Sequence, residues 1–376
     1  MKWIDRLELS QAQKTAWIFG AGASRSDPYA VPVQSELLQH FATMTRPGTK
    51  GLQAKLQELR ERVRGHCQRI QPGLAFDSTN LSLEEVFSAY ELVLANPASS
   101  QERLNAEGAV RDLGDALRQA TLVFGPGNAA KFKPYARDGT PSPYAELVEK
   151  LFPKTDPQAS LKKHPLITFN YDINLDRCLI NRRAVVDVDL DYGIPLANER
   201  SPGAPQFDPP RPDRSTLLLR LHGGLNWIRC QACQSCFVTV NKQAAVKEDD
   251  KCWTCGGQRL AYILVYPSFL RTYSDPLIQL VWGRCHEELV RADRWVFIGY
   301  SLPTADVHFR QLLRDCLRIR KEENLQTSVV LVGKEPELSS KDVVSYQHLF
   351  EGSPAELLVW KATTRGFSDF VDKALV

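Results

Sequence analysis

Short apolar runs recur along the chain, separated by segments with helical spacing. The runs are rich in β-branched residues, and several end in glycine, asparagine or serine just before a helical pattern begins. They cover residues 15–19, 166–169, 185–190, 217–221, 261–266, 295–299, 329–332 and 357–360. Strands of a parallel sheet that is buried on both faces have this composition. The sequence therefore predicts an α/β fold, with an open parallel sheet and helices on both of its faces.

Strand signals are scarce between residues 35 and 160, where helical patterns dominate. Apolar residues recur at helical spacing from Leu52 to Val63, and Ser82 with the acidic turn behind it is a typical helix start. We expect further helices over 101–123 and 143–152. The segment 35–160 is thus predicted to be a large helical insertion in a domain formed by 1–34 and 161–376.

Five of the nine cysteines crowd into residues 230–255, as Cys230-x-x-Cys233-x-x-Cys236 and Cys252-x-x-Cys255. Two such knuckles supply four thiolates, which is the closed shell of a structural zinc site. Pairing Cys230 with Cys233 leaves 18 residues before the second knuckle, and pairing Cys233 with Cys236 leaves 15. Both spacings are allowed. We predict a small zinc-ribbon module over 228–260 that binds one structural Zn²⁺ through Cys230, Cys233, Cys252 and Cys255, with Cys236 as the alternative to Cys230.

A glycine turn follows the first buried run, with Gly20, Ala21, Gly22 and Ser24 in close succession. Glycines at a strand end let backbone N–H groups approach a ligand, and a helix that starts there favours a phosphate. The turn lacks the complete G-x-G-x-x-G pattern, because Arg25 stands after Ser24. A purely structural turn explains it equally well.

Polar residues also follow three later runs. Asn170 and Asp172 come after 166–169, and they can hold a ligand or cap the helix that begins there. His222 stands at a strand end beside two glycines, where a general base can reach a ligand, although a lone histidine is often structural. Gly299 and Ser301 follow 295–298. Ligands of open α/β sheets bind beyond the carboxyl ends of strands, where all five residues are predicted to lie.

Charge and hydropathy exclude several classes of protein. The chain carries 47 basic and 44 acidic residues, without the concentrated positive field of a nucleic-acid binder. No stretch approaches the roughly 18 apolar residues of a membrane span. The first residues also lack the apolar run of a secretory signal. We expect a cytoplasmic protein that binds neither membranes nor nucleic acid directly.

In this order, the motifs resemble those of the Sir2 family. Sirtuins carry a Gly-Ala-Gly-x-Ser turn, a Thr-x-Asn-x-Asp segment, a His-Gly, two Cys-x-x-Cys knuckles and a Gly-x-Ser. The resemblance implies a Rossmann-like domain that binds NAD. It places Gly20, Ala21, Gly22 and Ser24 at the phosphates and ribose, Asn170 and Asp172 at the nicotinamide ribose and carboxamide, His222 as the base on a ribose hydroxyl, and Ser301 at the adenosine half. The catalytic pair would be His222 and Asn170, with Gly299 letting the ligand approach.

Three departures from the deacetylase pattern are informative. The region 29–33 lacks the Phe-Arg pair that follows the first turn in deacetylases. Residues 266–269, with Pro267, stand where deacetylases present a strand to the acetyl-lysine peptide. The helical insertion is also long. These features resemble the Sir2-like NAD hydrolases of prokaryotic anti-phage defence, in which Asn-Tyr-Asp and Gly-Tyr-Ser-Leu-Pro forms are common.

This resemblance implies an NAD hydrolase that releases nicotinamide and ADP-ribose and depletes NAD during infection. It also implies a homo-oligomer, or a complex with a nucleic-acid sensor or motor protein. One alternative is an NAD-dependent protein deacylase or ADP-ribosyltransferase. A second is a non-catalytic subunit that senses NAD or ADP-ribose within a complex.

Overall fold

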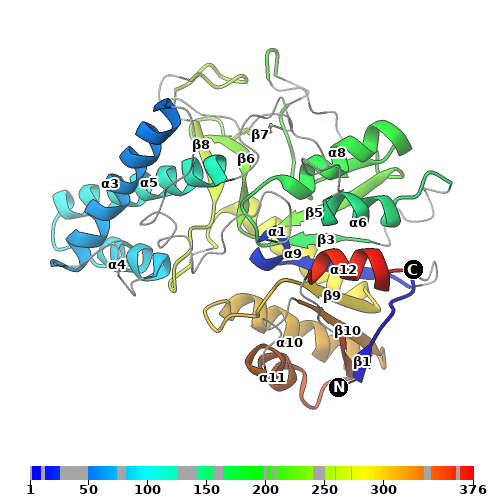
Figure 1. Cartoon of the computed structure of the whole chain (residues 1–376). Helices are drawn as coiled ribbons and strands as arrows, with labels where there is room; N and C mark the ends of the chain where they lie inside the picture. Colours follow the sequence, from blue (N-terminus) through cyan, green and yellow to red (C-terminus); the bar gives the residue numbers. More distant parts are fainter. Residues whose placement is uncertain are drawn as a thin grey trace. The chain divides into compact units, whose positions relative to one another are not determined.

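The chain divides into two compact units, which are described separately. The computed structural model describes residues 2–9, 13–25, 50–73, 82–124, 142–155, 164–198, 201–204, 207, 210–239, 250–258, 260–271, 273–333, 340–360 and 365–376. The larger unit comprises Met1–Tyr29, Asn128–Leu264 and Ser274–Val376, and the smaller comprises Ala30–Gly127 and Val265–Tyr273. Figure 1 shows the elements of both.

An eight-stranded sheet forms the centre of the larger unit, and each pair of neighbouring strands is parallel. From one edge to the other its strands are β1 (Lys2–Ile4), β11 (Ala355–Trp360), β10 (Thr327–Val332), β9 (Arg294–Ile298), β2 (Thr15–Phe19), β3 (Leu166–Thr168), β5 (Ser215–Arg220) and β4 (Asp189–Asp191). Every residue of β2 and β3 is buried, as expected of strands covered on both faces. The predicted Rossmann-like parallel sheet is confirmed.

The strands that follow β2 along the chain lie on both sides of it in the sheet. On one side lie β3, β5 and β4, and on the other lie β9, β10 and β11. Right-handed crossovers in two opposite directions place their helices on opposite faces of the sheet. The described helices of this unit are α1 (Ala21–Arg25), α6 (Pro143–Leu151), α8 (Asn174–Val186), α9 (Pro276–Arg291), α10 (Val307–Glu322), α11 (Ser340–Phe350) and α12 (Phe367–Asp369), followed by a π-helical turn, Phe370–Ala374. The boundary between β2 and β9 is therefore the point at which such folds bind ligands.

A second, antiparallel sheet has the order β7 (Cys236–Val238), β6 (Gly223–Cys230) and β8 (Leu260–Leu264). The run 261–266 was predicted for the parallel sheet, and this is wrong, because β8 pairs with β6 instead. An apolar run does not reveal which sheet it joins. The predicted strand 185–190 also starts too early. Helix α8 continues to Val186 and ends at Asp187, whose left-handed backbone (φ 52°) delays β4 until Asp189.

The smaller unit contains α3 (Lys50–Ile70), α4 (Leu83–Ala95) and α5 (Ser100–Phe124). Ser82 caps α4 in a capping box with Glu85, as its sequence predicts. The predicted insertion 35–160 differs from this division, because α6 belongs to the larger unit. Residues 29–33, which carry the first departure from deacetylases, lie outside the described residues. None of the described helices is both long and apolar enough to cross a bilayer.

Candidate functional site

The four polar motifs follow four neighbouring strands of the parallel sheet. The glycine turn follows β2, Asn170 follows β3, His222 follows β5 and Gly299 follows β9. These strands lie in the order β9-β2-β3-β5, so their carboxyl ends share one edge. Three steps between neighbouring strands span about 14 Å, which is the scale of a dinucleotide. The sheet thus brings the predicted loops together around the boundary between β2 and β9.

The two glycine turns touch each other closely. The Gly22 amide donates to the Gly299 carbonyl oxygen at 2.9 Å, and the Gly20 amide donates to Ile298 O at 3.0 Å. A Cβ at Gly20 would lie 2.5 Å from the Gly299 oxygen, and a Cβ at Gly299 would lie 2.2 Å from the Ala23 nitrogen. Glycine is therefore needed at both Gly20 and Gly299. The amides of Gly20 and Gly22 are already bonded within the protein, so these residues contribute close packing to the site.

We expect Gly299→Ala to lower the free energy of unfolding by about 2–5 kcal/mol. Gly299 has a φ of 58°, and its Cβ would also collide with the backbone of the first turn. The matched control is Gly352→Ala, which has a φ of 72° but open space around the added Cβ. This control should cost only about 1–2 kcal/mol, the strain of the left-handed conformation alone. Urea denaturation measures both, and equal losses would contradict the tight contact between the turns.

Ser24, Asn170 and Asp172 form one buried hydrogen-bonded group. The Ser24 hydroxyl donates to Asp172 Oδ2 at 2.8 Å, and Asn170 Nδ2 donates to Ser24 Oγ at 2.9 Å. Asn170 Nδ2 also bonds the Gly20 carbonyl at 2.9 Å, and the Tyr144 hydroxyl of α6 lies 3.0 Å from Ser24 Oγ. No described residue donates to the Asn170 amide oxygen. That oxygen is the part of the side chain that remains to orient a ligand or a water.

Asp172 links the site to the start of α8. Its second oxygen, Oδ1, accepts the Asn174 backbone N–H at 3.0 Å. Burial raises the pKa of Asp172, although the bonds from Ser24 and Asn174 partly oppose this effect. The capping alternative is therefore realised in part: Ile173 occupies the N-cap position, but the Asp172 carboxylate bonds the first turn. Both carboxylate oxygens hold neighbouring loops in place.

His222 lies among the aromatic side chains of the loop after β3. Its ring meets the Phe169 ring edge-on with centroids 5.2 Å apart and stacks on Tyr171 at 6.1 Å. The preceding residue is fixed from two directions, because Leu221 N donates to Thr168 O and Trp282 donates to Leu221 O. The imidazole is 4 % exposed. It thus stands beside the Asn170 loop, as the sequence motifs predict.

Tyr300, between Gly299 and Ser301, was not singled out from the sequence. Its ring stacks on Phe169 with centroids 4.5 Å apart, and its hydroxyl donates to Asp306 at 2.5 Å. The stack connects the loop after β9 with the loop after β3. Ser301 itself is exposed at this edge, and His308 is exposed on α10.

Arg220 and Asp176 form a buried ion pair under the site that the sequence motifs did not predict. Their side chains are 0 % and 1 % exposed, and the contact is 2.5 Å. Arg220 also donates to the carbonyl oxygens of Asn170 at 2.8 Å and Asp172 at 2.6 Å. The guanidinium therefore holds the backbone of the loop that carries both residues. An arginine inside the apolar run 217–221 was the available signal, because a buried arginine requires partners.

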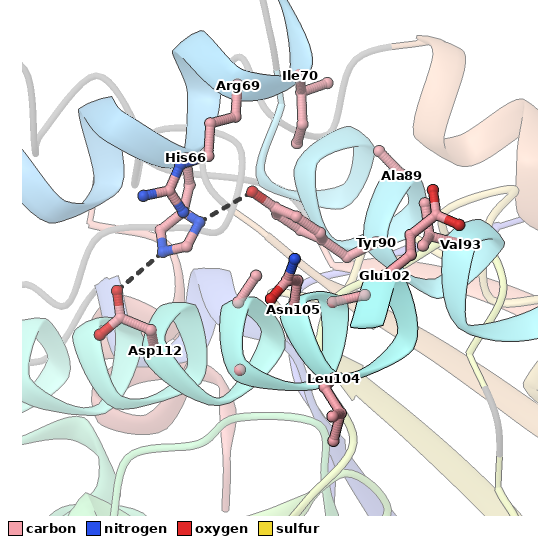
Figure 2. A pocket seen from close by; sticks show the side chains of 13 residues that line it. His66, Arg69, Ile70, Ala89, Tyr90, Val93, Glu102, Leu104, Asn105 and Asp112 are labelled. Atoms are coloured by element: carbon pink, nitrogen blue, oxygen red, sulfur yellow. Dashed lines mark hydrogen bonds and ion pairs between the residues drawn. The ribbon is translucent and has the colours of Figure 1, made fainter. Parts of the chain in front are cut away.

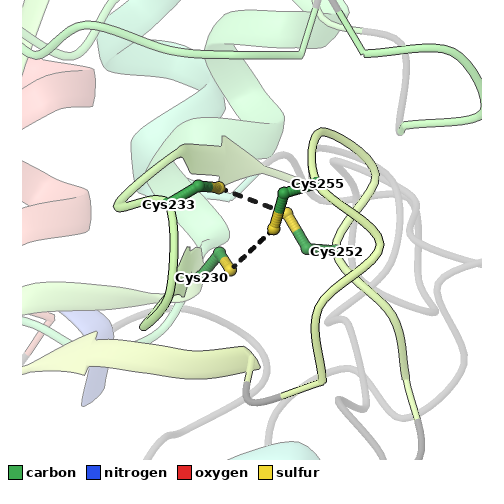
Figure 3. A group of neighbouring side chains, drawn as sticks. All are labelled: Cys230, Cys233, Cys252 and Cys255. Atoms are coloured by element: carbon green, nitrogen blue, oxygen red, sulfur yellow. Dashed lines mark hydrogen bonds between the residues drawn. The ribbon is translucent and has the colours of Figure 1, made fainter.

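Four cysteine sulfur atoms converge in the small antiparallel sheet (Figure 3). The Sγ atoms of Cys230, Cys233, Cys252 and Cys255 all lie within 4.8 Å of one another. Backbone N–H groups of Thr254 and Gly257 point at the sulfurs of Cys252 and Cys255, each at 3.4 Å. Four convergent sulfurs with N–H donors around them fit a tetrahedral zinc ion and leave no open position.

Cys236 lies outside this group. It is 3 % exposed in β7, and burial raises the pKa of its thiol to about 12. The four sulfur atoms that converge are those of Cys230, Cys233, Cys252 and Cys255. The structure therefore favours Cys230 over Cys236, the alternative that spacing alone left open.

The chain is similar in structure to Sir2 proteins. A structure from a study of the mechanism and regulation of Sir2 enzymes matches with 14% identity over 96% of this chain and 93% of its own, with a TM-score of 0.39. A Sir2 homologue–NAD complex matches with 15% identity over 96% and 88%, with a TM-score of 0.35. A Sir2–p53 peptide–NAD⁺ complex matches with 13% identity over 95% and 90%, with a TM-score of 0.35. No family model and no curated protein matches the sequence. Similarity at this level carries no functional inference by itself.

Proposed function

We propose that this chain is a Sir2-like NAD hydrolase, which cleaves the bond between nicotinamide and ribose. One observation carries the proposal: the loops after β9, β2, β3 and β5 bring Gly299, Ser24, Asn170 and His222 to one edge of the sheet. Their order along the chain and in the sheet supports the binding of a dinucleotide across the boundary between β2 and β9.

In this proposal the adenosine half lies by the exposed Ser301, and the phosphates lie over the turn from Gly20 to Ser24. The nicotinamide ribose lies between Asn170 and His222. The direct bonds of Ser24 with Asn170 and Asp172 support this arrangement, because they fix the two loops relative to each other. Preorganised polar groups of this kind stabilise charge that develops in a transition state.

The chemistry follows from these positions. The C–N bond to nicotinamide breaks through an oxocarbenium-like state, and nicotinamide leaves with the bonding electron pair. A water molecule held by the Asn170 amide oxygen adds to the ribose carbon, and His222 accepts its proton. The products are nicotinamide, ADP-ribose and a proton. The zinc ion, held by the four cysteines, has a structural role, since four thiolates leave no site for substrate.

The packing of segment 265–273 supports hydrolysis over deacylation. Tyr266 stacks on Phe87 of α4 with centroids 5.1 Å apart, and Phe269 N donates to the Ser88 hydroxyl at 2.8 Å. Ser268 also bonds Ser88, at 3.1 Å, and Glu91. This segment, which stands where deacetylases present a strand to an acylated peptide, is occupied by contacts with its own helical unit. Water is then the expected acceptor of the ADP-ribosyl group.

The test is a turnover assay with purified protein and NAD, in which nicotinamide and ADP-ribose are quantified by chromatography. We expect both products in equal amounts without any peptide, and no stimulation by an acetyl-lysine peptide. Release of nicotinamide only with the peptide would identify a deacylase. Radiolabel transferred from NAD to a protein would identify an ADP-ribosyltransferase. Tight NAD binding without turnover would identify a sensing subunit.

An NAD hydrolase that is always active would harm its own cell, so the proposal includes control by infection. We propose an NAD-depleting effector of anti-phage defence in the cytoplasm, working as a homo-oligomer or beside a nucleic-acid sensor or motor protein. Cellular NAD measured through a phage infection tests this role. A fall in NAD that needs this chain supports it, and unchanged NAD in infected cells opposes it.

A further inference from the structure

A pocket of about 810 Å³ lies within the helical unit, between α3, α4 and α5. All of its lining residues belong to the smaller unit, whereas the NAD motifs belong to the larger unit. Its volume falls in the range of small-molecule sites, roughly 300–1,000 Å³. Figure 2 shows side chains from all three helices around it. No part of the proposed reaction uses this pocket.

One wall of the pocket is a fixed polar network. His66 of α3 bonds the Tyr90 hydroxyl through Nδ1 at 2.9 Å and the Asp112 carboxylate through Nε2 at 2.8 Å. Arg62 in turn bonds and pairs with Asp112. Burial would raise the pKa of Asp112, but the hydrogen bonds from Arg62 and His66 outweigh it and lower this pKa. With both ring nitrogens engaged, the imidazole and the tyrosine hydroxyl are held in one orientation before any ligand binds.

Arg69 gives this lining a cation that can hold an anion. Asp112 is paired with Arg62, and the Glu102 carboxylate accepts the Ala98 N–H. Arg69 lines the pocket together with Tyr90. Burial raises the pKa of Tyr90, although Arg69 partly opposes this, so the hydroxyl keeps its proton. When the Nε2 proton of His66 goes to Asp112, Nδ1 accepts the Tyr90 proton, so the Arg69 guanidinium is the donor that this wall offers to an oxyanion.

Much of the remaining lining consists of apolar and small residues, beside the polar Glu102 and Asn105. Ala106 and Ala109 of α5 are buried in it, and Ile70 and Val93 belong to it on α3 and α4. Gly108 also lines the pocket, and a Cβ placed there would meet no heavy atom within 4 Å. The helices thus leave open space at this point. Such a site is shaped for a flat or apolar body attached to an acidic group.

From this geometry we infer that the pocket between α3, α4 and α5 binds a small organic anion, with its acidic group at Arg69 and its apolar body over Gly108. A purely structural network would clamp the three helices equally well, but it would require neither the open space at Gly108 nor a guanidinium on the wall. The two roles differ in whether a suitable probe binds there saturably.

The probe is 8-anilino-1-naphthalenesulfonate, an aromatic anion whose fluorescence rises on binding, and its neutral partner is N-phenyl-1-naphthylamine. Both are titrated into the full chain without NAD, so the result is independent of the proposed hydrolase activity. We expect Gly108→Leu to weaken both probes at least about tenfold by filling the pocket. Arg69→Gln should weaken only the anionic probe, by about tenfold, the size of a charge-assisted hydrogen bond.

The control is Gly65→Leu on α3, which also points into open space but does not line the pocket. It should bind both probes like the wild type, and melting temperatures confirm that all variants are folded. Two results would overturn the inference. One is a lack of saturable binding to the wild type, and the other is equal affinity for the anionic probe in wild type, Gly108→Leu and Arg69→Gln.

Discussion

His222→Ala should reduce kcat for nicotinamide release by about 10²–10⁴-fold, the usual contribution of a general base. The imidazole stands at the end of β5 beside the Asn170 loop, where its ring meets those of Phe169 and Tyr171. Because the preceding residue is held by the bonds of Leu221 with Thr168 and Trp282, loss of the ring should leave the backbone of the loop in place. Steady-state kinetics with NAD measure the effect.

The matched control for this variant is His348→Ala, which removes an exposed histidine from α11. Its kcat should equal that of the wild type. Asn170→Ala should also lose activity, because it removes the amide oxygen that would hold the water. Equal nicotinamide release by the wild type, His222→Ala and Asn170→Ala would refute these catalytic assignments.

Replacing Cys252 and Cys255 by serine should abolish zinc binding. The purified wild type is expected to contain a single zinc ion per chain, and the double variant almost none, by elemental mass spectrometry. Structural zinc supplies about 10 kcal/mol or more in isolated modules. Cys252 also packs with Ile228 and Phe237 in a small apolar cluster. We therefore expect the antiparallel sheet to lose its protection from amide hydrogen exchange, with a lower melting temperature.

Cys236→Ala separates metal binding from packing. This buried cysteine lies in the same small sheet but outside the four-sulfur cluster. The variant should keep its zinc and lose only the stability of a small cavity, about 1 kcal/mol. Zinc loss from Cys236→Ala, with zinc retained by Cys230→Ala, would reverse the assignment of the fourth ligand.

Local patterns predicted the elements that carry the site, because each depends on neighbouring residues. A buried apolar run that ends in a small or polar residue marks a strand end, and this identified β2, β3, β5 and β9. The capping box of Ser82 and Glu85 fixed the start of α4 in the same way. In contrast, β6 begins with two glycines and has an asparagine at its fourth position, a composition that does not indicate a strand.

Contacts between distant parts of the chain could not be predicted. The packing of Gly20 against Gly299 depends on β2 and β9 being neighbours in the sheet, which no local pattern reveals. The role of Arg220 depends on Asp176 and on two carbonyl groups brought close by the fold. The choice between Cys230 and Cys236 likewise required the side-chain directions in β6 and β7, since both spacings were chemically acceptable.

The central claim is that one nucleotide lies across the loops after β9, β2, β3 and β5, and a crystal structure with ADP-ribose tests it most directly. We predict density for the pyrophosphate over the turn from Gly20 to Ser24, with the distal ribose within hydrogen-bonding reach of Asn170 and His222 and the adenosine by Ser301. Ligand density at any other surface, with this edge of the sheet untouched, would contradict the claim.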